Sequence, residues 1–258
     1  MLPSIDDRLV EPETRYEMYD GELVYVPPAD PPHGIRHSKI SALVEAHAAA
    51  DFEVASDMLT RTSKTSDVAP DVSVFPSARD PVTGGRQLEQ LAFEVVSTQS
   101  IRRAGQKAAK LTERGVRRVF AIDVERARAL EWSRALGGWA LLDPDARIED
   151  PTLGAALPIA ALLHAAKADD AMACALIAKH NPAIEAVKSE ALQQGLAHGI
   201  LQGRAEAVLD LLALRGIAVD AADRTRILGE ADPAQLGRWL ARATTCTAAA
   251  ELFAADTR

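Results

Sequence analysis

The sequence lacks the features that would place the protein in a membrane or outside the cell. Nowhere do about 18 uncharged apolar residues follow one another, as a membrane-spanning helix requires. Residues 1–22 carry acids where a secretory signal peptide needs a basic stretch and an apolar run. The two cysteines, Cys174 and Cys246, are far apart and match neither a disulfide framework nor a zinc ligand set. We therefore expect a cytoplasmic protein without a membrane partner.

Familiar signatures of catalysis are also missing. The chain has no glycine-rich phosphate loop, no dinucleotide-fold fingerprint and no Ser-His-Asp arrangement. These absences argue against a nucleotide-binding fold and against a serine hydrolase. Hydrophobic residues nevertheless make up 48% of the chain and charged residues 26%, which is typical of a folded globular protein.

Positive charge is scarce overall but concentrated in one stretch. The net charge is −8, yet the segment 102–118 holds a single acid, Glu113. Its basic residues are Arg102, Arg103, Lys107, Lys110, Arg114, Arg117 and Arg118. Such a stripe can contact phosphates whatever the total charge. A solvated helix face would produce the same pattern, so charge alone does not decide between the two interpretations.

The residues up to 164 predict a mixed α/β fold. β-rich runs occur at 22–26, 71–75, 91–97 and 118–122, and a hairpin is expected where Gly137-Gly138 separates two further runs. Across that hairpin Trp132 and Trp139 should pack against each other. Helical patterns cover 33–50 and 101–114. The second helix joins two strands, which is the pattern of a βαβ unit.

After residue 165 alanine and leucine dominate, and the pattern predicts an all-α module. Helices are expected at 165–180, 182–215, 220–230, 233–243 and 247–255. We therefore place the domain boundary between residues 164 and 165, giving domains 1–164 and 165–258.

Three glycines in this module, Gly195, Gly199 and Gly203, recur every fourth residue and so share one helix face. Each costs roughly 1 kcal/mol of helix propensity relative to alanine, which suggests that another helix approaches closely. We expect a two-fold homodimer that uses this face. A helix packed on its own domain is the alternative explanation.

Three acids lie where predicted strands begin or run. Glu22 and Asp71 open strands, whereas Glu94 has apolar neighbours on both sides. A carboxylate inside an apolar strand is costly to bury unless it is paired or coordinates a cation. Several carboxylates brought together suit magnesium or manganese. We expect Asp71, Glu94 and Glu22 to form a metal site, although each acid alone could be a cap or a turn residue.

The helix 101–114 supplies cations to this region. Ala104, Ala108 and Leu111 form its apolar stripe. Lys107 lies at the border of that stripe and is the base best placed to reach back toward the sheet. The bases expected to face solvent or a phosphate backbone are Arg103, Lys110 and Arg114.

Two histidines one helical turn apart, His33 and His37, raise the question of zinc. Without a third ligand at a sensible spacing they are a weak zinc signal. We expect His33 to line the mouth of the site or to cap the helix, and His37 to lie on the surface.

In their order, the motifs YDGELV, VAPDVSVF, FEVVS and RRAGQKAAKLTERGV-RRVFAID resemble the Uma-two family of restriction endonucleases, within the PD-(D/E)XK nuclease superfamily. The resemblance covers about residues 14–163. Pro70-Asp71 matches the PD motif and Glu94 the acid of the next strand. The lysine normally two residues later is Val96 here, and Lys107 of the following helix aligns with the family's lysine. Glu22 and His33-Gly34 match an early acid and an HG motif.

Some positions depart from the family pattern. The turn Ser97–Ser100 is one residue shorter than usual, Arg103-Ala104 stands where an aspartate precedes the lysine, and Leu111 replaces a frequent tyrosine. These differences leave the metal acids intact and affect the pose of the helix.

The resemblance implies a restriction-endonuclease-like mixed sheet flanked by helices, and a metal-dependent endonuclease that hydrolyses phosphodiester bonds, with DNA as the expected substrate. Asp71, Glu94 and Glu22 would hold magnesium or manganese, and Lys107 would orient the attacking water. The nucleic acid would be contacted by Arg103, Lys110, Arg114 and His33. Two alternatives stay open: a catalytically silent nuclease fold that binds partners through its helical tail, and a purely structural oligomerisation protein.

Overall fold

The structure is a computed structural model that describes residues 2–11, 14–97 and 101–254. It divides into two compact units, unit 1 (Met1–Asn181) and unit 2 (Pro182–Arg258). The expected change to helical sequence at 165 does occur, but helix α4 (Ala165–Ala178) packs against α1 (Pro31–His47) and belongs to unit 1. The compact unit therefore ends about one helix later than the sequence boundary.

A six-stranded mixed sheet forms the centre of unit 1. Only β7 and β8 run parallel, and α2 (Ile101–Arg114) joins them, so the expected βαβ unit is confirmed. The other neighbouring strands are antiparallel. The strand order is β10 (Gly138–Leu141), β9 (Arg128–Ser133), β8 (Arg118–Asp123), β7 (Leu91–Val96), β6 (Val72–Pro76) and β3 (Phe52–Ser56). This mixed α and β architecture confirms the fold class expected from the sequence.

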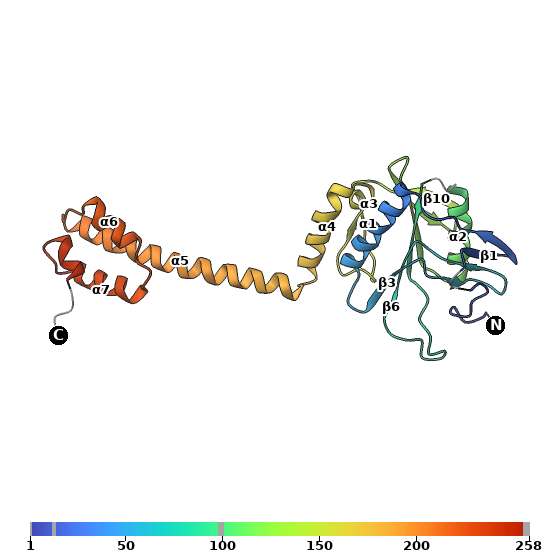
Figure 1. The fold of residues 1–258 in the computed structure, drawn as a ribbon, viewed down its shortest axis with the longest axis horizontal. Coiled ribbons are helices and arrows are strands. Elements are labelled where there is room, and N and C mark those ends of the chain that lie inside the picture. The colour runs from blue at the N-terminus through green and yellow to red at the C-terminus, as the bar shows by residue number, and fades with distance from the viewer. Residues whose placement is uncertain (1, 12–13, 98–100, 255–258) are drawn as a thin grey trace. The chain divides into compact units, whose positions relative to one another are not determined.

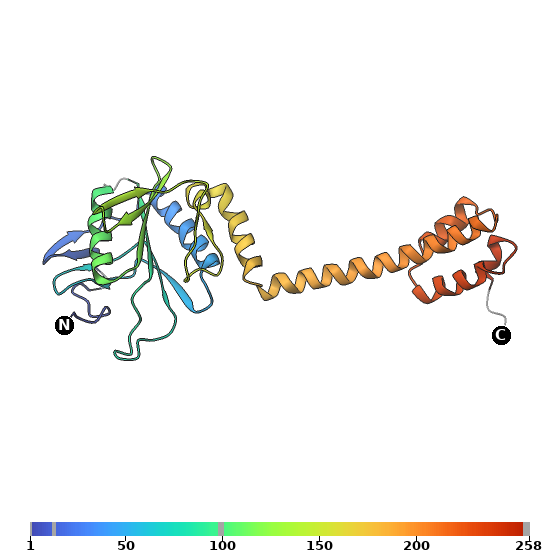
Figure 2. The ribbon, with the colours of Figure 1, turned by 180° about the vertical axis from the view of Figure 1, so that it is seen from behind.

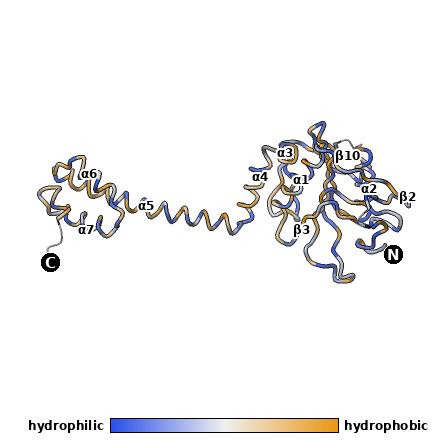
Figure 3. Tube along the Cα trace, in the orientation of Figure 1, coloured by the Kyte–Doolittle hydropathy of each residue, from blue (hydrophilic) through white to orange (hydrophobic). Residues whose placement is uncertain are grey.

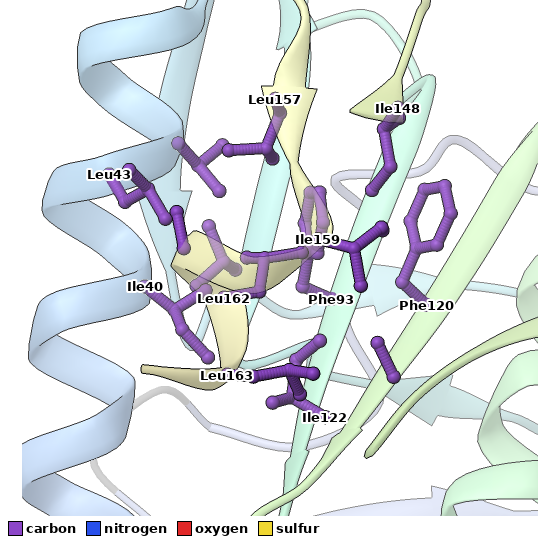
Figure 4. Close-up of a cluster of buried hydrophobic side chains, with 14 of the residues drawn as sticks. Ile40, Leu43, Phe93, Phe120, Ile122, Ile148, Leu157, Ile159, Leu162 and Leu163 are labelled. Carbon is purple, nitrogen blue, oxygen red and sulfur yellow. The ribbon is translucent and has the colours of Figure 1, made fainter. Parts of the chain in front are cut away.

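Helices cover both faces of this sheet (Figure 1, Figure 2). Helix α1 and the short α3 (Ile159–Leu163) lie on one face, where Ile40 and Leu43 belong to the same buried cluster as Phe93 (Figure 4). Helix α2 covers the other face, where Leu111 clusters with Ala92. Because successive residues of a strand point to opposite faces, odd-numbered positions of β7 face α1 and even-numbered positions face α2.

A smaller sheet lies beside the main one and contains the first hairpin. Its order is β2 (Glu22–Tyr25), β1 (Tyr16–Tyr19), β5 (Asp67–Val68) and β4 (Thr60–Arg61). The turn between β1 and β2 is Asp20-Gly21, with φ of 50° and 91°. An Asp-Gly pair with both φ values positive is the preferred two-residue hairpin turn. A third pair joins β11 (Arg147–Ile148) to β12 (Leu157–Pro158).

The predicted packing of Trp132 on Trp139 is present in the β9–β10 hairpin. The two residues pair in register, and their ring centroids lie 5.2 Å apart in an edge-to-face arrangement. A Cβ added at Gly105 of α2 would come within 3.1 Å of Trp132 and 3.2 Å of Trp139. The two rings therefore help to hold α2 against the sheet, and Gly105 gives them room.

Unit 2 consists of helices whose bounds lie close to those expected. They are α5 (Pro182–Leu214), α6 (Ala221–Leu228), α7 (Pro233–Ala243) and the 3-10 helix η1 (Ala249–Phe253). Leu212, Ile227 and Trp239 lie in its buried core. The buried residues of α5 all fall in its C-terminal part, from Ala205 onward. Apolar residues nevertheless recur along the rest of α5 (Figure 3).

The glycine face of α5 does not pack on other described residues. A Cβ added at Gly195, Gly199 or Gly203 would meet nothing within 4 Å. Tight packing inside the helix's own domain, the alternative explanation for these glycines, is therefore not what the structure shows. Among the residues described, no helix is long and apolar enough to cross a membrane.

Candidate functional site

Strand pairing brings Asp71 and Glu94 together. Val72 pairs with Phe93 in the antiparallel β6–β7 ladder, and the same register puts Asp71 opposite Glu94. Opposed residues point to the same face with Cβ atoms about 4.5–5.5 Å apart, so both carboxylates lie on the α2 face. Asp71 Oδ2 also accepts a 2.5 Å hydrogen bond from the Val95 amide. The two acids are 8% and 2% exposed, respectively.

Lys107 reaches this pair from α2. The apolar stripe of Ala104, Ala108 and Leu111 is buried against the sheet, as the sequence predicts. Lys107 beside that stripe therefore points inward and is itself buried. Its Nζ lies 3.1 Å from Glu94 Oε2 and donates a 2.7 Å hydrogen bond to the Ala69 carbonyl.

The third acid at Lys107 is Glu17, which sequence reasoning missed. Glu17 Oε1 lies 3.2 Å from Lys107 Nζ and accepts a 2.8 Å hydrogen bond from the Ala69 amide, while Oε2 accepts one from the Tyr19 hydroxyl. Glu22, the acid expected here, is exposed at the turn end of β2, opposite Tyr19. The available clue was the β-favouring Tyr16–Tyr19 segment, which forms a strand with Glu17 and Tyr19 on one face.

The electrostatics of this group favour a cation. Burial raises the pKa of Glu94 well above its usual value, and the charges of Asp71 and Glu17 add to the effect. Burial alone would lower the pKa of Lys107, but Glu17 and Glu94 together raise it well above its usual value, so Lys107 is charged. Burial opposes ionisation of Asp71 as well, yet the nearby imidazole of His33 and the charge of Lys107 hold its pKa below the usual value.

The donor set fits a divalent cation. Three buried carboxylates face one ammonium, so Lys107 neutralises only part of their charge. Glu94 Oε1 is fully buried and has no hydrogen-bond partner among the described residues. A buried carboxylate oxygen without a partner is costly, and oxygen ligands are what Mg²⁺ and Mn²⁺ prefer. Asp71 and Glu94 are the residues that could hold such an ion.

A pocket of about 370 Å³ opens onto one side of this group, and Glu94 is not part of its lining. Its lining includes Glu17, Asp71 and Lys107, together with His33, His37 and Asp57. Glu22 is not part of the lining. The pocket therefore gives a small polar ligand access to Glu17 and Asp71, which are otherwise buried.

The start of α1 positions both histidines in the pocket. Asp30 caps the helix by accepting a 2.8 Å hydrogen bond from the His33 amide, and two prolines follow the cap. The helix therefore begins at Pro31, two residues before the expected start. His33 Nε2 lies 3.7 Å from Asp71 Oδ1, and this contact raises the pKa of His33. The expectation that His33 lines the site therefore agrees with its position.

His37 is not the ordinary surface residue expected from the sequence. It is partly buried, lines the pocket, and its Nε2 lies 2.5 Å from the main-chain oxygen of Asp71. Asp57, in the turn after β3, brings a carboxylate 3.9 Å from the same Nε2. Sequence reasoning missed Asp57 because the fold alone brings it beside a helix some twenty residues earlier in the chain.

The cations expected to contact substrate divide into two groups. Arg103 lines the pocket, and its Nη2 donates to the Tyr25 carbonyl. Lys110 instead forms a 2.7 Å ion pair with Asp20, and Arg114 donates to the Pro3 carbonyl; neither lines the pocket. Arg15, before β1, lines the pocket and was not anticipated.

Comparison with solved structures finds the same fold. One similar fold is a crystal structure described as "a putative nuclease belonging to DUF820 from Anabaena variabilis ATCC 29413". It is 18% identical in sequence with a TM-score of 0.50, and the match covers 60% of this chain and 93% of that one. At this identity the likeness shows the fold alone.

A family-level comparison is more specific. The model of the Uma2 family, described as "Putative restriction endonuclease", matches residues 3–163 and confirms the resemblance seen in the sequence. A search of curated proteins found no match.

Proposed function

Because this chain belongs to the Uma2 family of restriction-endonuclease type, we propose that unit 1 is a divalent-metal-dependent nuclease that hydrolyses phosphodiester bonds in nucleic acid. One observation carries the metal dependence. Glu94 Oε1 is buried without a partner among the described residues, in a strand position opposite Asp71. An acid held in this way is explained by a cation that completes its coordination.

Each residue of the group has a separate role in this proposal. Asp71 and Glu94 hold Mg²⁺ or Mn²⁺, which when bound lowers the pKa of a water and offsets charge on the phosphate. Lys107 is fixed by Glu17 and the Ala69 carbonyl, so its ammonium is already in position. It stabilises the charge that develops on a nonbridging oxygen. Glu17 acts through Lys107 and is a positioning residue.

Arginines at the pocket would contact the nucleic-acid backbone. Arg15 and Arg103 both line it, and contacts from arginine to phosphate position a substrate without reading its sequence. We propose DNA as the substrate, in line with the family description.

A cleavage assay tests this function directly. Labelled single-stranded and double-stranded DNA and RNA are incubated with the full chain in Mg²⁺, in Mn²⁺ and in EDTA. Cleavage that needs metal and is stronger on DNA supports the proposal. Absence of cleavage on all four substrates with either metal would instead favour a silent nuclease fold that acts as a binding module.

We also propose that α5 pairs with α5 of a second copy of the chain. Leu192, Leu196 and Ile200 are exposed, and each lies three residues before one of the three open glycines. Large apolar residues and glycines thus alternate along one face, which suits close helix packing, and two-fold dimers are the commonest closed assembly. The buried residues of α5 begin at Ala205, so the glycine face lies N-terminal to the part of the helix that packs in the core of unit 2.

Sedimentation of the full chain tests the pairing. Leu196→Glu places a charge on the proposed face and should give a monomer. Gln194→Glu adds the same charge two residues away, on the opposite side of the helix, and should leave the dimer intact. A wild-type monomer at all concentrations would contradict the proposal.

A further inference from the structure

A second group of metal-ligand side chains lies beside the Asp71–Glu94 pair. His37, Asp57 and Asp71 each offer one ligand atom, and these atoms all lie within 4.8 Å of one another. The three residues come from different elements: α1, the turn after β3, and the residue before β6. Nothing in the proposed Mg²⁺ or Mn²⁺ binding by Asp71 and Glu94 uses His37 or Asp57.

The fold holds these three residues together through Asp71. The main-chain oxygen of Asp71 accepts a 3.2 Å hydrogen bond from the Asp57 amide and lies 2.5 Å from His37 Nε2. The hydroxyl of Ser41 adds a further link between α1 and β3. It donates to the His37 carbonyl and lies 2.9 Å from Ser56 Oγ, one residue before Asp57. Main-chain and hydroxyl contacts therefore hold the three ligand residues next to one another.

The distances are close to those of a bound ion. Ligand atoms at about 2.0–2.2 Å from one ion lie roughly 3.0–3.5 Å from each other, and His37 Nε2 lies 3.9 Å from Asp57 Oδ1. Small side-chain movements would bring the ligand atoms within reach of one ion. His37 Nε2 would then bind the ion instead of the Asp71 carbonyl. His33 Nε2, 3.7 Å from Asp71 Oδ1, is near enough to contribute a fourth ligand. The pocket lined by all four residues provides an entry path.

We propose that His37, Asp57 and Asp71 form a second metal site that prefers an imidazole-binding ion such as Mn²⁺ or Zn²⁺ over Mg²⁺. The preference follows from the nitrogen ligand, since imidazole suits transition metals whereas all-oxygen sets suit Mg²⁺. Asp71 is shared with the Asp71–Glu94 pair, so the inference extends the proposed nuclease site to two adjacent metal positions. Two-metal sites of this kind act on both the attacking and leaving oxygens of a phosphodiester.

Nitrogen coordination can be measured without any cleavage. The full chain is loaded with one equivalent of Mn²⁺ and examined by pulsed EPR, which detects coupling to a coordinated ¹⁴N, and Mn²⁺ affinity is measured by calorimetry. The wild type should show the nitrogen coupling. His37→Gln should reduce the coupling and weaken Mn²⁺ binding at this site by about 10-fold or more, since loss of even an outer-shell partner has that effect.

Matched variants separate this site from its neighbour. Glu94→Gln removes a ligand of the other position only and should keep the nitrogen coupling. His164→Gln changes an exposed histidine outside the pocket and should behave as wild type. Asp57→Asn changes a side chain that is 70% exposed, so the fold should survive while Mn²⁺ affinity falls.

Two results would overturn the inference: no nitrogen coupling in the wild type, or coupling that persists undiminished in His37→Gln. The outcome is distinct from that of the proposed nuclease function. A chain that cleaves nothing but shows His37-dependent coupling supports the metal site and contradicts the nuclease. A chain that cleaves DNA without such coupling supports the nuclease and contradicts the second metal site.

Discussion

The two faces of strands β6 and β7 carry very different side chains. On the α1 face Val72, Phe93 and Val95 are fully or almost fully buried in one cluster with apolar residues of α1 and α3. Figure 4 shows Phe93 in this cluster. On the α2 face the same strands present Asp71 and Glu94 to Lys107, almost equally buried. Adjacent residues of one strand, Phe93 and Glu94, thus lie in an apolar core and in a buried charged cluster.

The comparison separates what makes the protein fold from what makes it active. Phe93 stacks on Phe120 with ring centroids 5.1 Å apart, and burying such a side chain contributes about 1.5–3 kcal/mol to folding. Burial of Glu94 instead opposes its ionisation, as its raised pKa indicates. We therefore expect substitutions on the α1 face to cost stability and those on the α2 face to cost activity.

The largest expected effect is on catalysis, on the α2 face. Asp71→Asn removes a ligand charge and should lower metal-dependent cleavage by about 10²-fold to 10³-fold or more. Without metal its unfolding temperature should fall only modestly, because the lowered pKa of Asp71 means that its charge is favoured in the folded protein. Cleavage kinetics and thermal unfolding in EDTA measure the two effects. Outright unfolding of the variant would make Asp71 a structural residue and remove the contrast between the faces.

The second effect is on stability, on the α1 face. Phe93→Ala should lower the free energy of unfolding by about 3–5 kcal/mol, because it leaves a cavity in the main core. Urea unfolding measures the loss, and Phe93→Leu serves as the control with a smaller volume change. Cleavage per folded molecule should stay near the wild-type value. A stable Phe93→Ala variant would mean that this face is packed less tightly than its burial implies.

These faces also show how far the sequence could lead. The apolar periodicity of α2 predicted its bounds, Ile101–Arg114, and the inward position of Lys107. Strand patterns around Asp71 and Glu94 predicted that both would lie in the sheet, and the β6–β7 register placed them opposite each other. Local patterns were sufficient here because each residue's orientation follows from its own helix or strand.

The residues that sequence reasoning missed depend on contacts between distant segments. Glu17 meets Lys107, and Asp57 meets His37, only after separate elements have packed together. Glu22 was expected in the cluster because it opens a strand, but its place at the hairpin turn leaves it exposed. Sequence periodicity predicts which face of its helix or strand a residue occupies. It does not predict which other element packs against that face.

A third and smaller effect concerns the pH dependence of stability, because a buried histidine of α1 would have to become charged in acid. His47 of α1 is 1% exposed and its Nδ1 contacts the Leu43 carbonyl, and burial lowers its pKa below the usual 6.5. The unfolded chain thus binds a proton at pH values where the folded chain does not. The contribution of His47 to the free energy of unfolding is therefore complete above pH 6.5 and is lost as the pH falls through the lowered pKa.

His47→Gln should therefore reduce the drop in unfolding temperature between neutral pH and pH values below 6.5. Thermal unfolding in EDTA across this range measures the drop, and His164→Gln, an exposed position, is the control. An unchanged pH dependence in His47→Gln would show that the buried imidazole is not what makes this face sensitive to acid.

The central claim, that Glu94 is buried to hold a catalytic cation, is tested most directly by single-turnover cleavage with saturating Mn²⁺. Glu94→Gln keeps the shape of the side chain and removes its charge, while Glu22→Gln makes the same change at the exposed hairpin turn. The account predicts that Glu94→Gln loses about 10²-fold or more in rate and that Glu22→Gln cleaves as wild type does. Equal rates for the two variants would contradict it.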